Sequence, residues 1–189
     1  MHSLARSRAV RLVGLPALAA LGNVLLNDLN RSLESPLFFD SIFTAVTAAL
    51  LGPWSGLVTA LLSSAGMEVV VGLSGAPGTA FPFVGCEIAT ALVVAGAVKI
   101  GSFRTVADLV LVTVAVTLAN AIVGSFTATL VFGGITLHGS DVLVTGLLLG
   151  GQKLLEAAFW VRIPLNLVDK SLAVGLAFWM YRLSQKTRG

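Results

Sequence analysis

Long apolar stretches separated by short polar breaks fill the chain. They predict six membrane-spanning helices, at residues 9–29, 37–52, 54–73, 80–99, 105–133 and 164–183. About 20 apolar residues carry a helix across the hydrocarbon core of a bilayer. The second stretch is short and the fifth is long, which predicts a locally thin bilayer or tilted helices. The pattern therefore predicts an all-α integral membrane protein.

Residues 142–162 form a further apolar segment that carries ionisable side chains in its second half. Lys153, Glu156 and Arg162 lie there, and each would cost about 2.5–3.5 kcal/mol at the centre of a bilayer. A seventh span would also place the two ends of the chain on opposite faces of the membrane. We therefore expect segment 142–162 to be re-entrant or amphipathic on the outer face, and Pro164 to begin the last span.

Basic residues set the expected orientation. They gather near both chain ends and in one short connection, at Arg6, Arg8, Arg11, Lys99, Arg104, Arg182, Lys186 and Arg188. Basic residues that flank membrane spans favour the cytoplasmic face. We therefore expect a multi-pass protein of the plasma (inner) membrane with both termini in the cytoplasm. The basic start and first apolar stretch also match a secretory signal, but the stretch is longer than a usual signal core, which favours a retained helix.

Composition supports the same class of protein. Of the 189 residues, 56% are apolar and only 11% are charged, and the mean hydropathy is +0.94. A soluble domain carries about 25% charged residues. The net charge of +3 forms no basic face, so we expect no nucleic-acid partner. The single Cys86 predicts no intrachain disulfide. We treat residues 1–189 as a single transmembrane substrate-binding domain.

Acidic side chains inside the expected spans lie at one depth. At a rise of about 1.5 Å per residue, Glu68, Glu87 and Asp169 each lie roughly 7–10 Å below the outer ends of three different helices. Lys170 accompanies Asp169. Ionisable groups inside a membrane are costly and are usually functional. The layer predicts a site for a small molecule in the outer third of the protein.

Further candidate contacts to a ligand are Asn120, Lys153, Glu156, Trp160 and Asn166. Helical spacing lets Lys153, Glu156 and Trp160 line one face of the outer segment, and lets Asn166 and Lys170 share a face of the last helix. Alternatives stay open. Lys153 and Glu156 also fit a solvated helix face, Trp160 fits an interfacial anchor, and Lys170 fits an ion pair with its neighbour. Mixed charges beside an aromatic ring would suit a small aromatic zwitterion or a vitamin.

Catalysis finds little support in the sequence. His2 and His138 are the only histidines, and neither has a partner at metal-ligand spacing. No H-E-x-x-H, G-x-S-x-G, Walker A or C-x-x-C motif occurs. We therefore expect no enzyme activity, no bound metal and no cofactor, and the energy for any active transport must come from partner proteins.

Four short stretches carry the pattern of a known family. They are Phe39-Asp40-Ser41-Ile42-Phe43-Thr44-Ala45, Ala48-Ala49-Leu50-Leu51-Gly52-Pro53-Trp54-Ser55-Gly56, Phe132-Gly133-Gly134-Ile135-Thr136 and Leu167-Val168-Asp169-Lys170. In order and spacing they resemble the S components of energy-coupling factor (ECF) transporters, which are importers of the ABC type. The resemblance covers about residues 35–183.

The resemblance implies a six-helix subunit that binds a micronutrient outside the cell, such as a vitamin, a vitamin precursor or an aromatic amino acid-like compound. It implies as partners a transmembrane coupling protein and two cytoplasmic ATPase subunits. It also implies a site in the outer half of the membrane, walled mostly by helices four to six. The alternative from another class is a membrane nutrient-sensing or signalling module, which a fused kinase or cyclase domain would indicate.

Overall fold

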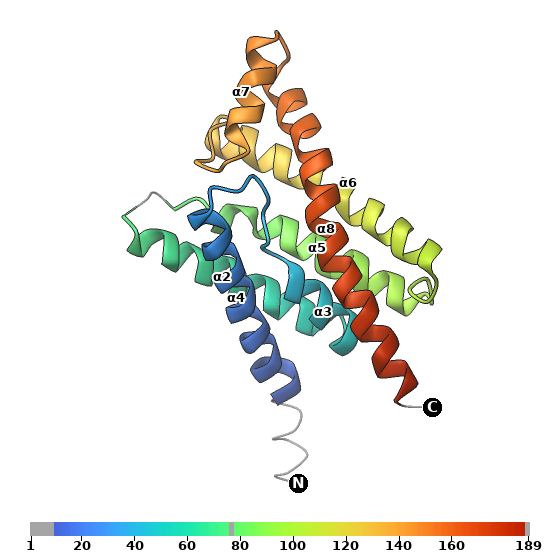
Figure 1. Ribbon diagram of the computed structural model, residues 1–189. Coiled ribbons are helices and arrows are strands. Elements are labelled where there is room, and N and C mark those ends of the chain that lie inside the picture. The colour runs from blue at the N-terminus through green and yellow to red at the C-terminus, as the bar shows by residue number, and fades with distance from the viewer. Residues whose placement is uncertain (1–9, 76–77, 188–189) are drawn as a thin grey trace.

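Residues 10–75 and 78–187 are described by the computed structural model of the chain, and every regular element in them is helical. The elements are η1 (Val10–Gly14), α2 (Leu15–Ser32), α3 (Ile42–Leu51), α4 (Pro53–Leu73), η2 (Phe81–Phe83), α5 (Val84–Lys99), α6 (Val106–Phe132), α7 (Asp141–Leu149) and α8 (Leu154–Lys186). The short α3 packs against α2, α4, α5 and α8. α7 and the first turns of α8 project at the end away from the last turns of α8 (Figure 1).

Five helices in the described parts of the chain are long and apolar enough to cross a membrane. They are Leu12–Ser32, Pro53–Leu73, Phe81–Lys99, Val106–Phe132 and Leu154–Lys186. The expected class of helical membrane protein is therefore supported, but six spans are not confirmed. The second expected span contains a helix of only ten residues, α3, which is about 15 Å long against a hydrocarbon core of about 30 Å.

Local signals explain where several helices begin and end. At the start of α6, the Asp108 carboxylate accepts from the Thr105 backbone N–H at 2.8 Å and the Thr105 hydroxyl accepts from the Asp108 N–H at 3.2 Å. This reciprocal pair is a capping box. The chain reverses between α3 and α4 at Gly52, whose φ of 95° favours glycine. Pro53 then begins α4, where its missing N–H leaves no hydrogen bond unmade.

The segment at 142–162 is a helical hairpin rather than one continuous piece. α7 packs on the first turns of α8 through Val144, Ala157 and Val161. α8 then continues through Pro164 to Lys186 as a single helix of 33 residues. The expectation that Pro164 begins the last helix is wrong, because a proline removes one backbone hydrogen bond and packed neighbours in a helical membrane protein hold the helix together.

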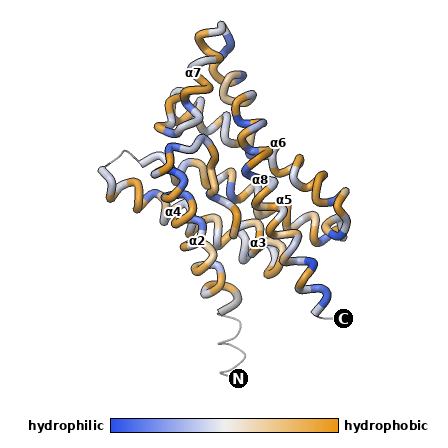
Figure 2. Tube along the Cα trace, viewed as in Figure 1, coloured by the Kyte–Doolittle hydropathy of each residue, from blue (hydrophilic) through white to orange (hydrophobic). Residues whose placement is uncertain are grey.

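The outward surface of the helices is apolar. Leu18, Leu25, Leu111 and Leu130 are each more than half exposed, and hydrophobic residues run along the lengths of the helices (Figure 2). A soluble protein does not expose an apolar surface of this extent. The hydrocarbon of a bilayer would cover it, while the buried polar side chains lie between the helices.

Four of the basic side chains lie together at one end of the bundle. Arg104, in the connection between α5 and α6, shares a surface hollow with Arg182 and Lys186 near the end of α8. Lys99 ends α5 on the same side and is exposed. Arg6, Arg8 and Arg188 lie outside the described residues. The basic residues around the α5–α6 connection and near the end of α8 therefore share one end of the bundle, and the orientation in the membrane stays a prediction.

Small residues bring the helices close together. Gly56 of α4 faces Ala48 of α3 and Ala91 of α5, and a Cβ at Gly56 would lie 2.8 Å and 3.1 Å from the Cβ atoms of those two alanines. Contacts this short leave no space for a methyl group. The close approach of small residues is a common basis of helix packing in membranes, where helices gain little from the hydrophobic effect.

We expect Gly56→Ala and Gly72→Ala, both in α4, to change stability in opposite directions. Gly56→Ala should lower the free energy of unfolding by about 1–3 kcal/mol, because the methyl group overpacks three helices. A Cβ at Gly72 meets nothing within 4 Å, so Gly72→Ala should raise stability by about 0.5–1 kcal/mol through helix propensity. Thermal melting in detergent measures both, and equal effects would contradict the packing described.

Candidate functional site

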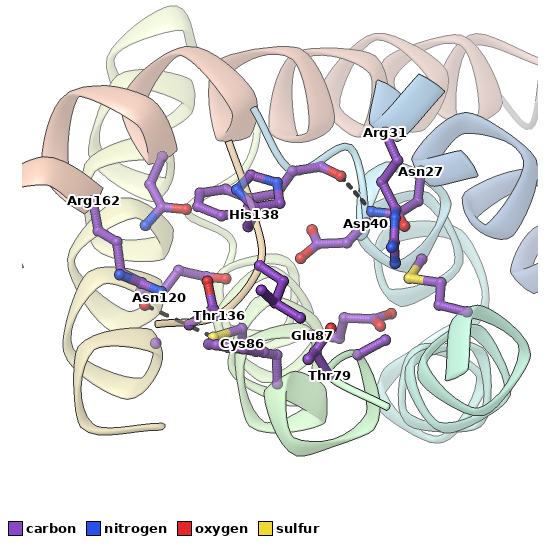
Figure 3. Close-up of a pocket in the computed structure, with 17 residues that line it drawn as sticks. Asn27, Arg31, Asp40, Thr79, Cys86, Glu87, Asn120, Thr136, His138 and Arg162 are labelled. Carbon is purple, nitrogen blue, oxygen red and sulfur yellow. Dashed lines mark hydrogen bonds between the residues drawn. The ribbon is translucent and has the colours of Figure 1, made fainter. Parts of the chain in front are cut away.

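A cavity lies among α2, α4, α5, α6 and α8, at the end of the bundle away from Arg104, Arg182 and Lys186. Its lining is Asn27, Arg31, Phe38, Asp40, Met67, Thr79, Ala80, Phe83, Cys86, Glu87, Asn120, Gly124, Thr136, Leu137, His138, Arg162 and Asn166. Figure 3 shows these side chains converging from the helices and from the loops above them. The cavity volume is about 90 Å³, room for several water molecules at about 10–15 Å³ each. Leu137 is 62% exposed, so the cavity reaches the surface.

Glu87 lies at the base of the cavity in a network of hydroxyl groups. It is 3% exposed, and its two carboxylate oxygens accept from Ser64 Oγ at 2.6 Å and from Thr44 Oγ1 at 3.2 Å. Thr44 Oγ1 in turn accepts from the side-chain amide of the fully buried Asn23 at 3.0 Å. Asn23 also binds the Phe43 N–H. The network therefore connects α2, α3, α4 and α5 beneath the cavity.

A buried ion cluster ties the loop before α3 to α8. Lys170 Nζ lies 2.8 Å from Asp40 Oδ1 and 2.6 Å from Asp169 Oδ2. Lys170 also donates to Ser41 Oγ at 2.8 Å. Asp169 Oδ1 accepts from the Phe39 backbone N–H at 2.8 Å. Because these contacts occupy the ammonium group, the cluster fixes one wall of the cavity through Asp40, while Asp169 and Lys170 lie behind the lining.

Arg162 of α8 lies at one end of the cavity, and Arg31 and Asn27 of α2 lie at the other (Figure 3). Arg162 is 4% exposed. Its one hydrogen bond among the described residues is a long one, 3.4 Å from Nη1 to the Ala158 carbonyl. Its guanidinium carbon lies 5.7 Å from the centroid of the Phe83 ring. On the α6 side, a Cβ at Gly124 would lie 2.9 Å from Arg162 Nε, so the missing side chain gives the guanidinium its space.

His138 and Phe38 form the roof of the cavity. Their rings stack with centroids 4.9 Å apart at an interplanar angle of 19°. Nε2 of His138 lies 3.1 Å from the Leu37 carbonyl, and Nδ1 accepts from the Ser140 backbone N–H at 3.2 Å. The bonding pattern assigns the proton to Nε2. Burial lowers the pKa of His138 below its ordinary value, against the opposing effect of the Leu37 carbonyl, so the ring is neutral at pH 7.

Three of the nine site residues expected from sequence line this cavity. Glu87 is described above. Asn120 donates to Thr90 Oγ1 at 2.9 Å and to the Val116 carbonyl at 3.0 Å. Asn166 is 3% exposed and faces the cavity from α8. Helices α5, α6 and α8 bring these three side chains together, although the sequence separates them widely.

The other expected site residues lie elsewhere. Glu68 holds the loop after α4, since its Oε2 accepts from the Ala80 and Phe81 N–H groups at 2.9 Å and 2.8 Å. Lys153 and Glu156 are exposed. Trp160 is 58% exposed, and it lines a separate apolar hollow on the surfaces of α6 and α8 together with Glu156. With Asp169 and Lys170 in the ion cluster, none of these six side chains lines the cavity.

Sequence reasoning missed several residues of the cavity wall, among them Asp40, His138 and Arg162. Asp40 and His138 are in loops, where no helical periodicity shows which way a side chain faces. Arg162 stands beside a proline and so indicated a helix boundary. The one available signal was its charge inside a stretch long and apolar enough to cross a membrane, which is a reason to expect function.

Neither the donor set nor similarity to other proteins identifies the ligand. Among the described residues, no group of three or more His, Cys, Asp and Glu side chains has an arrangement that would hold a metal ion. Comparison of the chain with protein-family models, with curated proteins and with solved structures finds no match. The geometry of the cavity is therefore the basis for assigning a function.

Lys170→Met should destabilise the protein by about 3–5 kcal/mol, because it leaves Asp40 and Asp169 buried without a counter-charge. Lys153→Met is the matched control, since Lys153 is exposed and its loss should change stability by less than about 0.5 kcal/mol. Thermal melting in detergent at pH 7 compares the two variants. Similar melting temperatures for both variants would contradict the prediction that the ion cluster stabilises the folded protein.

The neutral His138 predicts a loss of stability on acidification. The lowered pKa means that below pH of about 6.5 the unfolded chain binds a proton that the folded protein does not. Stability is therefore complete above this pH and falls as the pH drops through the lowered pKa. Melting temperatures between pH 7.5 and 5 should fall less for His138→Gln than for the wild type, and parallel curves would contradict the assignment.

Proposed function

We propose that the protein is the substrate-binding subunit of an ECF-type ABC importer. It captures a small micronutrient, such as a vitamin, a vitamin precursor or an aromatic amino acid-like compound, and releases it inward when joined to its partners. The observation that carries the proposal is the cavity between the helices, lined by the buried polar groups of Glu87, Asn120, Arg162 and Asn166. Small-molecule sites are largely preformed concave pockets with a few converging polar groups.

The position of the cavity supports capture from outside the cell. The cavity and the exposed Arg104, Arg182 and Lys186 lie at opposite ends of the bundle. Basic residues beside membrane spans favour the cytoplasm, so the cavity opens outward and both termini are cytoplasmic. α3 then crosses the inner part of the membrane, and the loop before it contributes Phe38 and Asp40 to the outward-facing cavity.

Energy for inward delivery comes from partners. The 189 residues contain no Walker A motif, and a phosphate-binding loop of that kind is what an ATPase subunit uses. A transmembrane coupling protein and two cytoplasmic ATPase subunits supply the energy for delivery. The chain itself binds substrate and hydrolyses nothing.

Native mass spectrometry of the purified protein tests the proposal. We expect a co-purified small organic molecule on the wild-type chain, with occupancy reduced in Glu87→Gln and unchanged in Glu156→Gln. Glu87 holds the base of the cavity through Ser64 and Thr44. Loss of hydrogen bonding in this network costs about 1–3 kcal/mol, or roughly 5-fold or more in affinity. Glu156 is exposed outside the cavity, so it is the matched control. A ligand-free wild type, or equal occupancy in both variants, would contradict a binding function at this cavity.

A further inference from the structure

The guanidinium of Arg162 is buried without a counter-charge in the described structure. The ion pairs of the described residues all involve Lys170, and Arg162 makes only the long contact to the Ala158 carbonyl. Guanidinium carries five N–H donors, so most of its donors have no protein acceptor. Burying a charge without a partner is among the costlier arrangements in a protein. The free-energy cost of burying the Arg162 guanidinium unpaired indicates that a bound anion is its missing partner.

A second unpartnered polar group stands beside it. Asn166 follows Arg162 by four residues on α8, so the two side chains share one face of the helix. Asn166 is 3% exposed and lines the same cavity, and its amide makes no hydrogen bond to any described residue. A guanidinium and an amide on adjacent turns present several N–H donors to one point, which suits the two oxygens of a carboxylate.

The acidic residues of the cavity are engaged elsewhere and leave Arg162 to a ligand. Glu87 accepts from Ser64 and Thr44. Asp40 is paired with Lys170. Asp141, on the loop side, accepts from the Thr136 N–H at 2.7 Å and from its hydroxyl at 2.8 Å. None of the three forms an ion pair with Arg162.

Aromatic rings flank the same space. Phe83 lies under the Arg162 guanidinium, and the stacked pair of Phe38 and His138 lines the cavity above. Planar walls of this kind favour a flat apolar group, because aromatic rings pack in offset or edge-to-face arrangements at centroid distances of about 4.5–7 Å. Arg31 lines the same cavity from α2, but Arg162 is the cation that lies against these rings. The walls therefore fit a flat ligand whose negative charge meets Arg162.

We propose that Arg162 and Asn166 bind the carboxylate of a small aromatic acid, whose ring lies between Phe83 and the Phe38–His138 pair. The proposal rests on the proposed function, whose substrate class it names. Gly124 is part of the proposed carboxylate site, because a side chain at that position would displace the Arg162 guanidinium.

Thermal melting in detergent with two simple probes tests the anion site. Benzoate at millimolar concentration should raise the melting temperature of the wild type, whereas benzamide, the uncharged amide of the same shape, should not. The benzoate-induced shift should be absent in Arg162→Met and reduced in Arg162→Lys, which keeps the charge but loses the planar fork. Arg104→Met, at the opposite end of the bundle, should respond to benzoate as the wild type does.

The ligand-free variants separate binding from a structural role. If Arg162 is held without a partner for a ligand, Arg162→Met removes an unpaired buried charge and should melt above the wild type without benzoate. A lower melting temperature, or failure of both Arg162 variants to fold, would make Arg162 structural and overturn the proposal. Absence of a benzoate shift in the wild type, or an equal shift in Arg162→Met, would also overturn it.

The two proposals fail in different ways. A co-purified molecule without an anionic group that is lost in Glu87→Gln would overturn the carboxylate site and leave the importer subunit in place. Benzoate binding through Arg162 in a protein that joins no ATPase-bearing complex in its own membrane would leave the anion site standing and overturn the importer.

Discussion

The ammonium group of Lys170, enclosed by Asp40 and Asp169, is the interaction on which the rest of the architecture depends. It joins the loop before α3 to α8, and through Ser41 it reaches the residue that precedes the first turn of α3. A helix as short as α3 has too little hydrophobic length to be held by the bilayer alone. Its place between α2, α4, α5 and α8 is set by this cluster and by the Asn23 network, which contacts α3 from the other side.

The ion cluster and the hydroxyl network determine which charges around the cavity are paired. Because Asp40 is paired with Lys170 and Glu87 is satisfied by Ser64 and Thr44, the negative charges around the cavity already have partners. The cations Arg162 and Arg31 line the cavity near its two ends, and neither forms an ion pair among the described residues (Figure 3). The protein thus stabilises its carboxylates internally, whereas the two guanidinium groups that line the cavity have no counter-charge among the described residues.

The long helices followed from hydrophobic length alone: the stretches at 54–73 and 105–133 correspond to α4 and α6 within one residue at each end. The hairpin at 142–162 could not be predicted in the same way. A proline within an apolar stretch is compatible both with the first turn of a new helix and with a helix that continues through it, and α8 continues through Pro164. For the cavity, charge inside an apolar helix identified Glu87, but the same rule selected Glu68, whose carboxylate caps a loop. Depth along a helix is readable from sequence, whereas the direction of a side chain around it depends on neighbours that the sequence does not specify.

Asp40 and Lys170, which form an ion pair, are 130 residues apart in the sequence. During synthesis, the pair can therefore form only after most of the chain has been made. Asp40 leaves the ribosome long before its cation exists, so its carboxylate has no counter-charge while α4, α5 and α6 enter the membrane. The hydrogen bonds from Asn27 and Asn30 of α2 to the Phe38 and Leu37 carbonyls can hold the loop at that stage. Arg162 and Asn166 are on the same last helix as Lys170. One late event, the insertion of α8, therefore neutralises the loop and completes the cavity together, and a nascent chain that stops short of it has neither.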